Sequence, residues 1–124
     1  MSHQFEELSN RILAAAIDVH KTLGPGFLES IYQMAMEVAL VHRGIVFQPQ
    51  KEVHVYFEDV DVGLHRLDLV VDAQIIVELK AVKSLDDIHF AQLRSYLKAT
   101  GLHTGLLLNF NAPTLAIKRV VFGS

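Results

Sequence analysis

The chain has 124 residues, of which 51% are hydrophobic, and 14 Asp and Glu against 11 Lys and Arg give it a formal net charge of −3. This length suits one domain with a single core, which we expect to span residues 1–124. The acidic balance disfavours a broadly basic protein of the kind that covers nucleic acid, although a local basic rim remains compatible with it.

The sequence contains no cysteine. Disulfides and thiolate metal sites are therefore excluded, and we expect a cytoplasmic protein. No apolar run approaches the roughly 20 residues of a membrane span, and Met1–Glu7 lacks the apolar segment of a signal peptide. The high hydrophobic content predicts instead that a second copy covers part of the surface, as in a homodimer.

Two amphipathic helices are predicted at the start of the chain. Residues 8–23 place apolar side chains on one helical face: Leu8, Ile12, Ala15, Ala16, Val19 and Leu23. Gly24-Pro25-Gly26 ends this helix, and a second helix follows over residues 27–42. His20 is either a cap or core neighbour at the end of the first helix, or a residue that contacts substrate or metal-bound water.

Four segments with strand character come next: Ile45–Phe47, Lys51–Phe57, Leu64–Val71 and Ile75–Val82. Pro49 marks a sheet edge or a bend. The acidic residues 58–61 have too few ligands at the spacing of a calcium loop, so they predict a solvated hairpin tip.

Asp72-Ala73-Gln74 is predicted to join the last two of these strands as a three-residue loop. In that register Asp68 lies across from Glu78, and Glu78 and Lys80 share one face of their strand. Two carboxylates and an ammonium on an apolar hairpin are costly to desolvate unless they bind each other, water or a metal. The group is therefore either a Mg²⁺ site or a cross-strand salt bridge on a solvated sheet.

A third helix and two more strands complete the pattern. Ser84 is the expected N-cap of a helix that ends near Thr100, before Gly101. The nearly continuous apolar run His103–Phe110 predicts a central strand, parallel to a neighbour because a helix precedes it. With a last strand at Ile117–Phe122, we expect an α/β fold: a single compact domain with a mixed central β-sheet of about five strands flanked by helices.

Asp68 and Glu78-Leu79-Lys80 are separated by nine residues and resemble the Asp…(Asp/Glu)-X-Lys motif of the PD-(D/E)XK nuclease superfamily, with Leu67 in place of the usual proline. Residues 26–32, with Gly26, Glu29 and Tyr32, are similar to the pattern of the GxxExxY family within that superfamily. The likeness covers nearly the whole chain, including residues 77–82 and 107–111. It implies a restriction-endonuclease-like fold with an αβββαβ core.

The same resemblance implies hydrolysis of phosphodiester bonds in DNA, or less readily RNA, with Mg²⁺ or Mn²⁺ as cofactor. Asp68, Glu78, the carbonyl of Leu79 and Glu29 would bind the metal, and Lys80 would position the attacking water. Without this role, a carboxylate in the first turn of a helix, such as that of Glu29, still interacts favourably with the helix dipole.

Further residues are assigned to the site by pattern. Gln92 and Tyr96 lie four apart and resemble the Q-x-x-x-Y accessory motif of RecB-like nucleases, where they would orient Lys80 or the nucleic-acid backbone. Tyr32 braces Glu29 or packs, and Arg66, which shares the strand parity of Asp68, is expected to contact it or a phosphate. The alternative function is a non-catalytic module of the same fold that binds nucleic acid or a protein partner.

Overall fold

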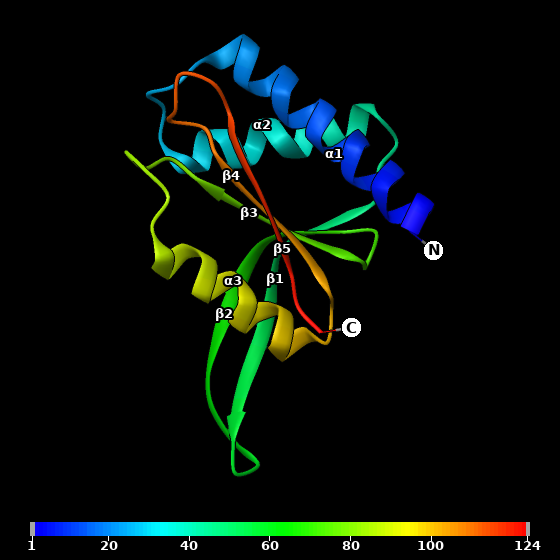
Figure 1. Ribbon diagram of the computed structural model, residues 1–124, viewed down its shortest axis with the longest axis vertical. Helices are drawn as coiled ribbons and strands as arrows, with labels where there is room; N and C mark the ends of the chain where they lie inside the picture. Colours follow the sequence, from blue (N-terminus) through cyan, green and yellow to red (C-terminus); the bar gives the residue numbers. More distant parts are fainter. Residues whose placement is uncertain (1, 124) are drawn as a thin grey trace.

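The computed structural model describes residues 2–123, and it describes side chains from Glu6 onward. The elements in chain order are α1 (Ser2–Leu23), α2 (Glu29–His42), β1 (Phe47–Phe57), β2 (Val60–Val71), β3 (Ile75–Lys80), α3 (Asp87–Thr100), β4 (Thr104–Asn109) and β5 (Ala116–Val121). Figure 1 shows α1 and α2 together at one end of the molecule, with the β1–β2 hairpin projecting at the other. Among the described residues, no helix is both long and apolar enough to cross a membrane.

The strands form one sheet in the order β1-β2-β3-β4-β5. β3 and β4 run parallel, joined through α3, and the other neighbouring strands are antiparallel. All residues of β4 are buried, which explains its continuous apolar sequence. The predicted α/β fold with a mixed sheet of five strands is confirmed.

Two apolar clusters cover the two faces of the sheet. On one face, α1 and α2 pack through residues such as Ile12 and Tyr32 against Leu69 and Leu106. On the other face, Leu93 and Leu97 of α3 pack against side chains that include Leu67, Val70 and Ile76. The apolar stripe predicted for residues 8–23 is confirmed as the buried face of α1, apart from Leu23 at its end, which is only partly buried.

The sheet divides at Asp68. β2 pairs with β3 only through Leu69, Val70 and Val71, and before these residues it pairs with β1 alone. Leu67 and Val70 both belong to the α3-side cluster although their separation by three residues would place them on opposite faces of a regular strand. The alternation of side chains is therefore broken at Asp68, at the point where β2 leaves β3.

β1 is irregular opposite this point. Pro49 pairs with Leu69 and Lys51 pairs with Leu67, whereas Gln50 between them has a left-handed φ of 51°. β1 is the edge strand of the sheet, where the missing N–H of a proline is tolerated. The bend predicted at Pro49 thus lies within one long strand.

Two local predictions were wrong, and a third was correct. Ile45 lies outside β1, because its N–H donates to Leu40 O at 3.0 Å and so completes the end of α2. Asp86, not Ser84, is the N-cap of α3, and its N–H donates to Nδ1 of His89 at 2.9 Å. The end predicted at Gly101 is correct, since this glycine adopts a left-handed φ of 77°.

Candidate active site

The side chains of Asp68 in β2 and Glu78 in β3 each accept a hydrogen bond from the backbone of the other strand. The backbone N–H of Asp68 donates to Glu78 Oε1 at 3.1 Å, and the N–H of Leu79 donates to Asp68 Oδ2 at 2.8 Å. The neighbouring pair Leu69 and Val77 has the register predicted from the three-residue loop. We call the point beside Asp68 where β2 leaves β3 the fork of the sheet. Each carboxylate uses one of its two oxygens to join the two strands there.

Burial and mutual repulsion keep this pair hard to ionise. Burial, and next the charge of Asp68, raise the pKa of Glu78 from its ordinary 4.5 to about 8. Burial also raises the pKa of Asp68, against the opposing effects of the Leu79 N–H and of Lys80. The two carboxyl groups therefore favour protonation of Glu78 or a bound cation over two full negative charges.

Lys80 lies near this pair without binding it. Its positive charge lowers the pKa of Asp68, of Glu78 and of Glu29, yet no ion pair within 4.0 Å joins Lys80 to a described acidic side chain. The predicted alternative of a cross-strand salt bridge is therefore not what the described side chains form.

The end of β3 is anchored by Asn109, which sequence analysis did not single out. Its side-chain amide donates to Val82 O at 2.9 Å and its Oδ1 accepts from Val82 N at 3.1 Å. Phe110 N also donates to Lys80 O at 2.9 Å. These bonds fix the backbone from Lys80 to Val82. A polar residue that ends an apolar strand was the signal for Asn109.

The first turns of α2 reach the site through two side chains. Glu29 is exposed as a whole residue. Its pKa is nevertheless raised, first by desolvation of the carboxyl group and second by the charge of Asp68. Gln33, one turn further on, is buried and donates from Nε2 to Asp68 O at 2.9 Å. Gln33 was missed, although its spacing from Glu29 places both on one helical face.

Tyr32 holds the loop in front of Glu29 and makes no hydrogen bond to Glu29 itself among the described atoms. Its hydroxyl donates to Gly24 O at 2.6 Å and accepts from Phe27 N at 3.1 Å. Its buried ring stacks on Phe110 with centroids 4.7 Å apart. Of the two predicted roles, Tyr32 therefore packs, and it sets the start of α2 through the loop.

Two aromatic rings stand on the α3 side of the site. His65 and Tyr96 stack with centroids 4.0 Å apart and planes at 14°. Burial lowers the pKa of His65 and raises that of Tyr96, and both groups also feel the charge of Asp68. Tyr96 is thus brought to the site, whereas the exposed Gln92 makes no hydrogen bond to any other described site residue.

Gln50 is a further side chain at the site that sequence analysis did not assign. Its side chain lies near enough to the Asp68 carboxylate to lower the pKa of that group. The left-handed backbone of Gln50 places this side chain, and only the tertiary structure makes that conformation evident.

Two residues proposed for the site lie elsewhere. Arg66 binds the exposed carboxylate of Glu52 at 3.2 Å, because the broken alternation of β2 separates it from Asp68. His20 is buried, with Nε2 2.8 Å from Ala112 O and its ring against Phe110. His20 is therefore a core neighbour at the end of α1.

The donor set suits a hard divalent cation. The described part of the chain contains no group of three or more His, Cys, Asp or Glu side chains that could hold a metal ion. The Asp68–Glu78 pair supplies two carboxylates, which is the number that Mg²⁺ commonly takes alongside water. The Leu79 carbonyl faces the same edge as its N–H, which binds Asp68, so a backbone oxygen is directed there as well.

Comparison with known proteins agrees with this geometry. A crystal structure of the protein SSO0001 matches with a TM-score of 0.60 and 20% sequence identity, covering 77% of this chain and 50% of that one. The chain thus spans half the length of that structure, and the likeness shows the fold. A search of curated proteins found no match. Residues 6–120 match the family described as the PD-(D/E)XK nuclease superfamily. The fork of the sheet, the carboxylate pair and this match lead to one conclusion: the chain belongs to the PD-(D/E)XK nuclease superfamily.

Proposed function

We propose that the protein is a metal-dependent nuclease that hydrolyses phosphodiester bonds in DNA. The observation that carries the proposal is the buried Asp68–Glu78 pair, with Lys80 close enough to affect both carboxyl groups but paired with neither. Superfamily membership supports a nuclease-type function. The overall charge of −3 is no obstacle, because metal-binding carboxylates contribute to it.

Each residue has a distinct proposed role. Asp68, Glu78 and the Leu79 carbonyl would hold Mg²⁺ or Mn²⁺, and Glu29 would reach the ion through water. Bound there, the ion would polarise the phosphate and stabilise the leaving oxygen. Lys80 would orient the attacking water and neutralise charge on the phosphate.

We also propose that the chain is a member of the GxxExxY family. The three residues of the motif would act together. The Tyr32 hydroxyl would close the loop that contains Gly26, and this loop would place Glu29 at the site from the first turn of α2. This arrangement gives a physical reason for the spacing of the motif. Gln92 and Tyr96 would act on the side of α3, Tyr96 through its ring beside His65.

Cleavage of labelled DNA and RNA tests the proposed function. The panel contains single-stranded, duplex and flapped substrates, with Mg²⁺, with Mn²⁺ or with EDTA. We expect metal-dependent cleavage of DNA and a fall of about 100-fold or more in Lys80→Ala, the size of effect seen when one transition-state donor is removed. The matched control is Lys83→Ala, because Lys83 is an exposed lysine three residues away.

Two outcomes would contradict the proposal. Equal cleavage by the wild type and Lys80→Ala would assign the activity to a contaminant. Binding without metal-dependent cleavage of any substrate would favour the non-catalytic alternative, a module of the same fold that binds nucleic acid or a protein partner.

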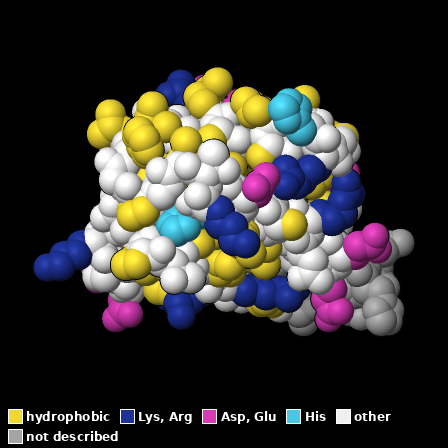
Figure 2. Space-filling model, turned by 90° about the horizontal axis from the view of Figure 1, so that it is seen from above, with side chains coloured by type: hydrophobic (Ala, Val, Ile, Leu, Met, Phe, Trp, Pro, Cys, Tyr) yellow, Lys and Arg dark blue, Asp and Glu magenta, His cyan; other side chains and the backbone are white. Residues whose placement is uncertain are grey.

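We further propose that two copies form a homodimer through the outer face of α2. Leu28, Met34, Val38 and Val41 are 75%, 60%, 52% and 64% exposed there. Their spacing along most of the helix is that of a helix-packing seam. Figure 2, seen from above, shows hydrophobic side chains gathered on one part of this end of the molecule. Light scattering that finds a monomer at micromolar concentration would remove the dimer and leave the nuclease proposal unaffected.

A further inference from the structure

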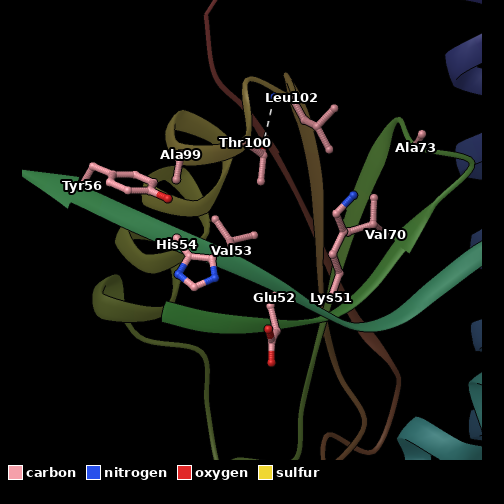
Figure 3. Close-up of a pocket in the computed structure, with 10 residues that line it drawn as sticks. All are labelled: Lys51, Glu52, Val53, His54, Tyr56, Val70, Ala73, Ala99, Thr100 and Leu102. Atoms are coloured by element: carbon pink, nitrogen blue, oxygen red, sulfur yellow. Dashed lines mark hydrogen bonds between the residues drawn. The ribbon is translucent and has the colours of Figure 1, made fainter. Parts of the chain in front are cut away.

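A groove runs between β1 and α3, and neither carboxylate of the Asp68–Glu78 pair lines it. It consists of two adjoining cavities of about 380 and 460 Å³ that share Val53, His54, Tyr56 and Ala99. Figure 3 shows the first cavity, with Tyr56 beside α3 at one end and Lys51 at the other. We call these two cavities the β1–α3 groove.

The groove adjoins the candidate active site. His65 and Tyr96 line its second cavity. The same two side chains feel the charge of Asp68, so this end of the groove is near the carboxylate pair. A chain whose phosphate lies at the carboxylates can therefore continue past the stacked rings into the groove.

Aromatic surface is available along the groove. Tyr56 is 64% exposed, and its ring lies 6.4 Å from that of His54 at a tilt of 38°. Neither side chain belongs to an apolar core cluster. An exposed aromatic ring beside a cavity provides a surface on which an unpaired base can stack.

The charged residues of the groove favour an anionic ligand. Lys51 lines the first cavity and Lys98 the second. Glu52 is the single carboxylate among the lining residues, and Arg66 binds it at 3.2 Å. Asp61 binds the lining His54 at 2.8 Å. Lys51, Lys98 and Arg66 therefore face two carboxylates in and beside the groove. The groove is thus locally positive in a protein whose overall charge is −3.

We propose that the β1–α3 groove binds a single-stranded segment of DNA that continues from the scissile phosphate. Bases stack on Tyr56, and Lys51 and Lys98 contact the phosphates. A duplex hides the faces of its bases, so a site built on an exposed ring favours unpaired nucleotides. The proposal rests on the proposed nuclease function and adds the class of substrate.

Fluorescence anisotropy tests the groove separately from cleavage. The probes are a labelled oligothymidine of 15 nucleotides and a blunt duplex of matched length, measured with Mg²⁺ in the Lys80→Ala background. We expect Tyr56→Ala to weaken binding of the single strand roughly fivefold or more, with little change for the duplex. Phe57→Ala is the matched control, because Phe57 is the next residue, is 66% exposed and does not line the groove.

A salt titration tests the phosphate contacts. Lys98→Ala is expected to reduce the slope of log Kd against log salt by about 0.7 for the single strand, the value for one phosphate contact. Lys118→Ala on the exposed part of β5 is the control and leaves the slope unchanged.

Each result has a defined meaning. Three results would overturn the proposed binding site. These are equal losses of affinity in Tyr56→Ala and Phe57→Ala, no loss in either variant, and no binding of the single strand at all. If the groove variants behave as expected but the wild type cleaves nothing, the proposed nuclease function fails while the binding site stands.

Discussion

The two halves of β2 meet at Asp68 and are built on different principles. In the inner half, Leu69, Val70 and Val71 are at most 2% exposed and pair with strands on both sides. In the outer half, Val60 and Val62 are 61% and 59% exposed, and β1 is the sole neighbouring strand. Burial stabilises the inner half throughout, whereas in the outer half it reaches only Leu67, and the exposed end depends on backbone hydrogen bonds to one edge strand. The carboxylates lie at the boundary between the part of β2 that pairs on both sides and the part that pairs with β1 alone.

The largest expected difference between the two halves is in stability. Leu69→Ala should lower the free energy of unfolding by about 2–5 kcal/mol, because it leaves a cavity in the core. Val62→Ala should change it by less than about 0.5 kcal/mol, because the side chain is on the surface. Urea denaturation measures both, and similar losses in the two variants would show that the outer half is buried in solution.

The fork itself should respond to pH. The folded pKa of Glu78, about 8, lies above its ordinary 4.5, so the folded protein binds more protons between these values than the unfolded chain does. Its free energy of unfolding is therefore highest below pH 4.5 with respect to this group and decreases as the pH rises towards 8. A difference of one in pKa corresponds to about 1.4 kcal/mol, so the effect should be of the order of a few kcal/mol.

Thermal melts in EDTA between pH 5 and pH 8 measure this dependence. Glu78→Gln removes the titrating group and should flatten the profile. Glu52→Gln is the control, since Glu52 is an exposed carboxylate in β1, where β1 pairs with the outer half of β2. A profile that rises with pH in the wild type would contradict the raised pKa.

Divalent cations should stabilise the fork. Mg²⁺ or Mn²⁺ at about 100 times its Kd should add about 2.7 kcal/mol to the free energy of unfolding of the wild type. Asp68→Asn should lose most of this response and melt no lower than the wild type in EDTA, because a buried repulsion is relieved. Absence of any metal response, together with a lower melting temperature for Asp68→Asn, would point to a structural role for the pair.

The smallest expected effect comes from the support of the fork by α2. Tyr32→Phe keeps the stacked ring but removes the hydroxyl that joins Gly24 and Phe27, at a cost of about 1 kcal/mol. If the hydroxyl positions Glu29, the metal concentration that half-saturates cleavage should rise more than the stability loss explains. An unchanged metal requirement would leave Tyr32 with packing alone.

Much of the fold followed from local pattern. Periodicity predicted the first two helices, start and stop signals predicted the third, and the alternating and apolar segments predicted the five-stranded sheet. The register at Asp68 was predictable because a loop at Asp72–Gln74 leaves one pairing that puts both carboxylates on the same face. Boundaries were less accurate, as at Ser84, because capping depends on where the chain enters the helix.

The sequence by itself determined the order of elements and the meeting of Asp68 with Glu78, because both depend on spacing along one or two strands. Only the tertiary structure decided where the sheet divides, since that depends on how β1, β3 and α3, which are distant in the chain, all pack around β2. This division removed Arg66 from the site and brought in Gln50. Gln33 reached the site in the same way, through contacts between elements distant in the chain.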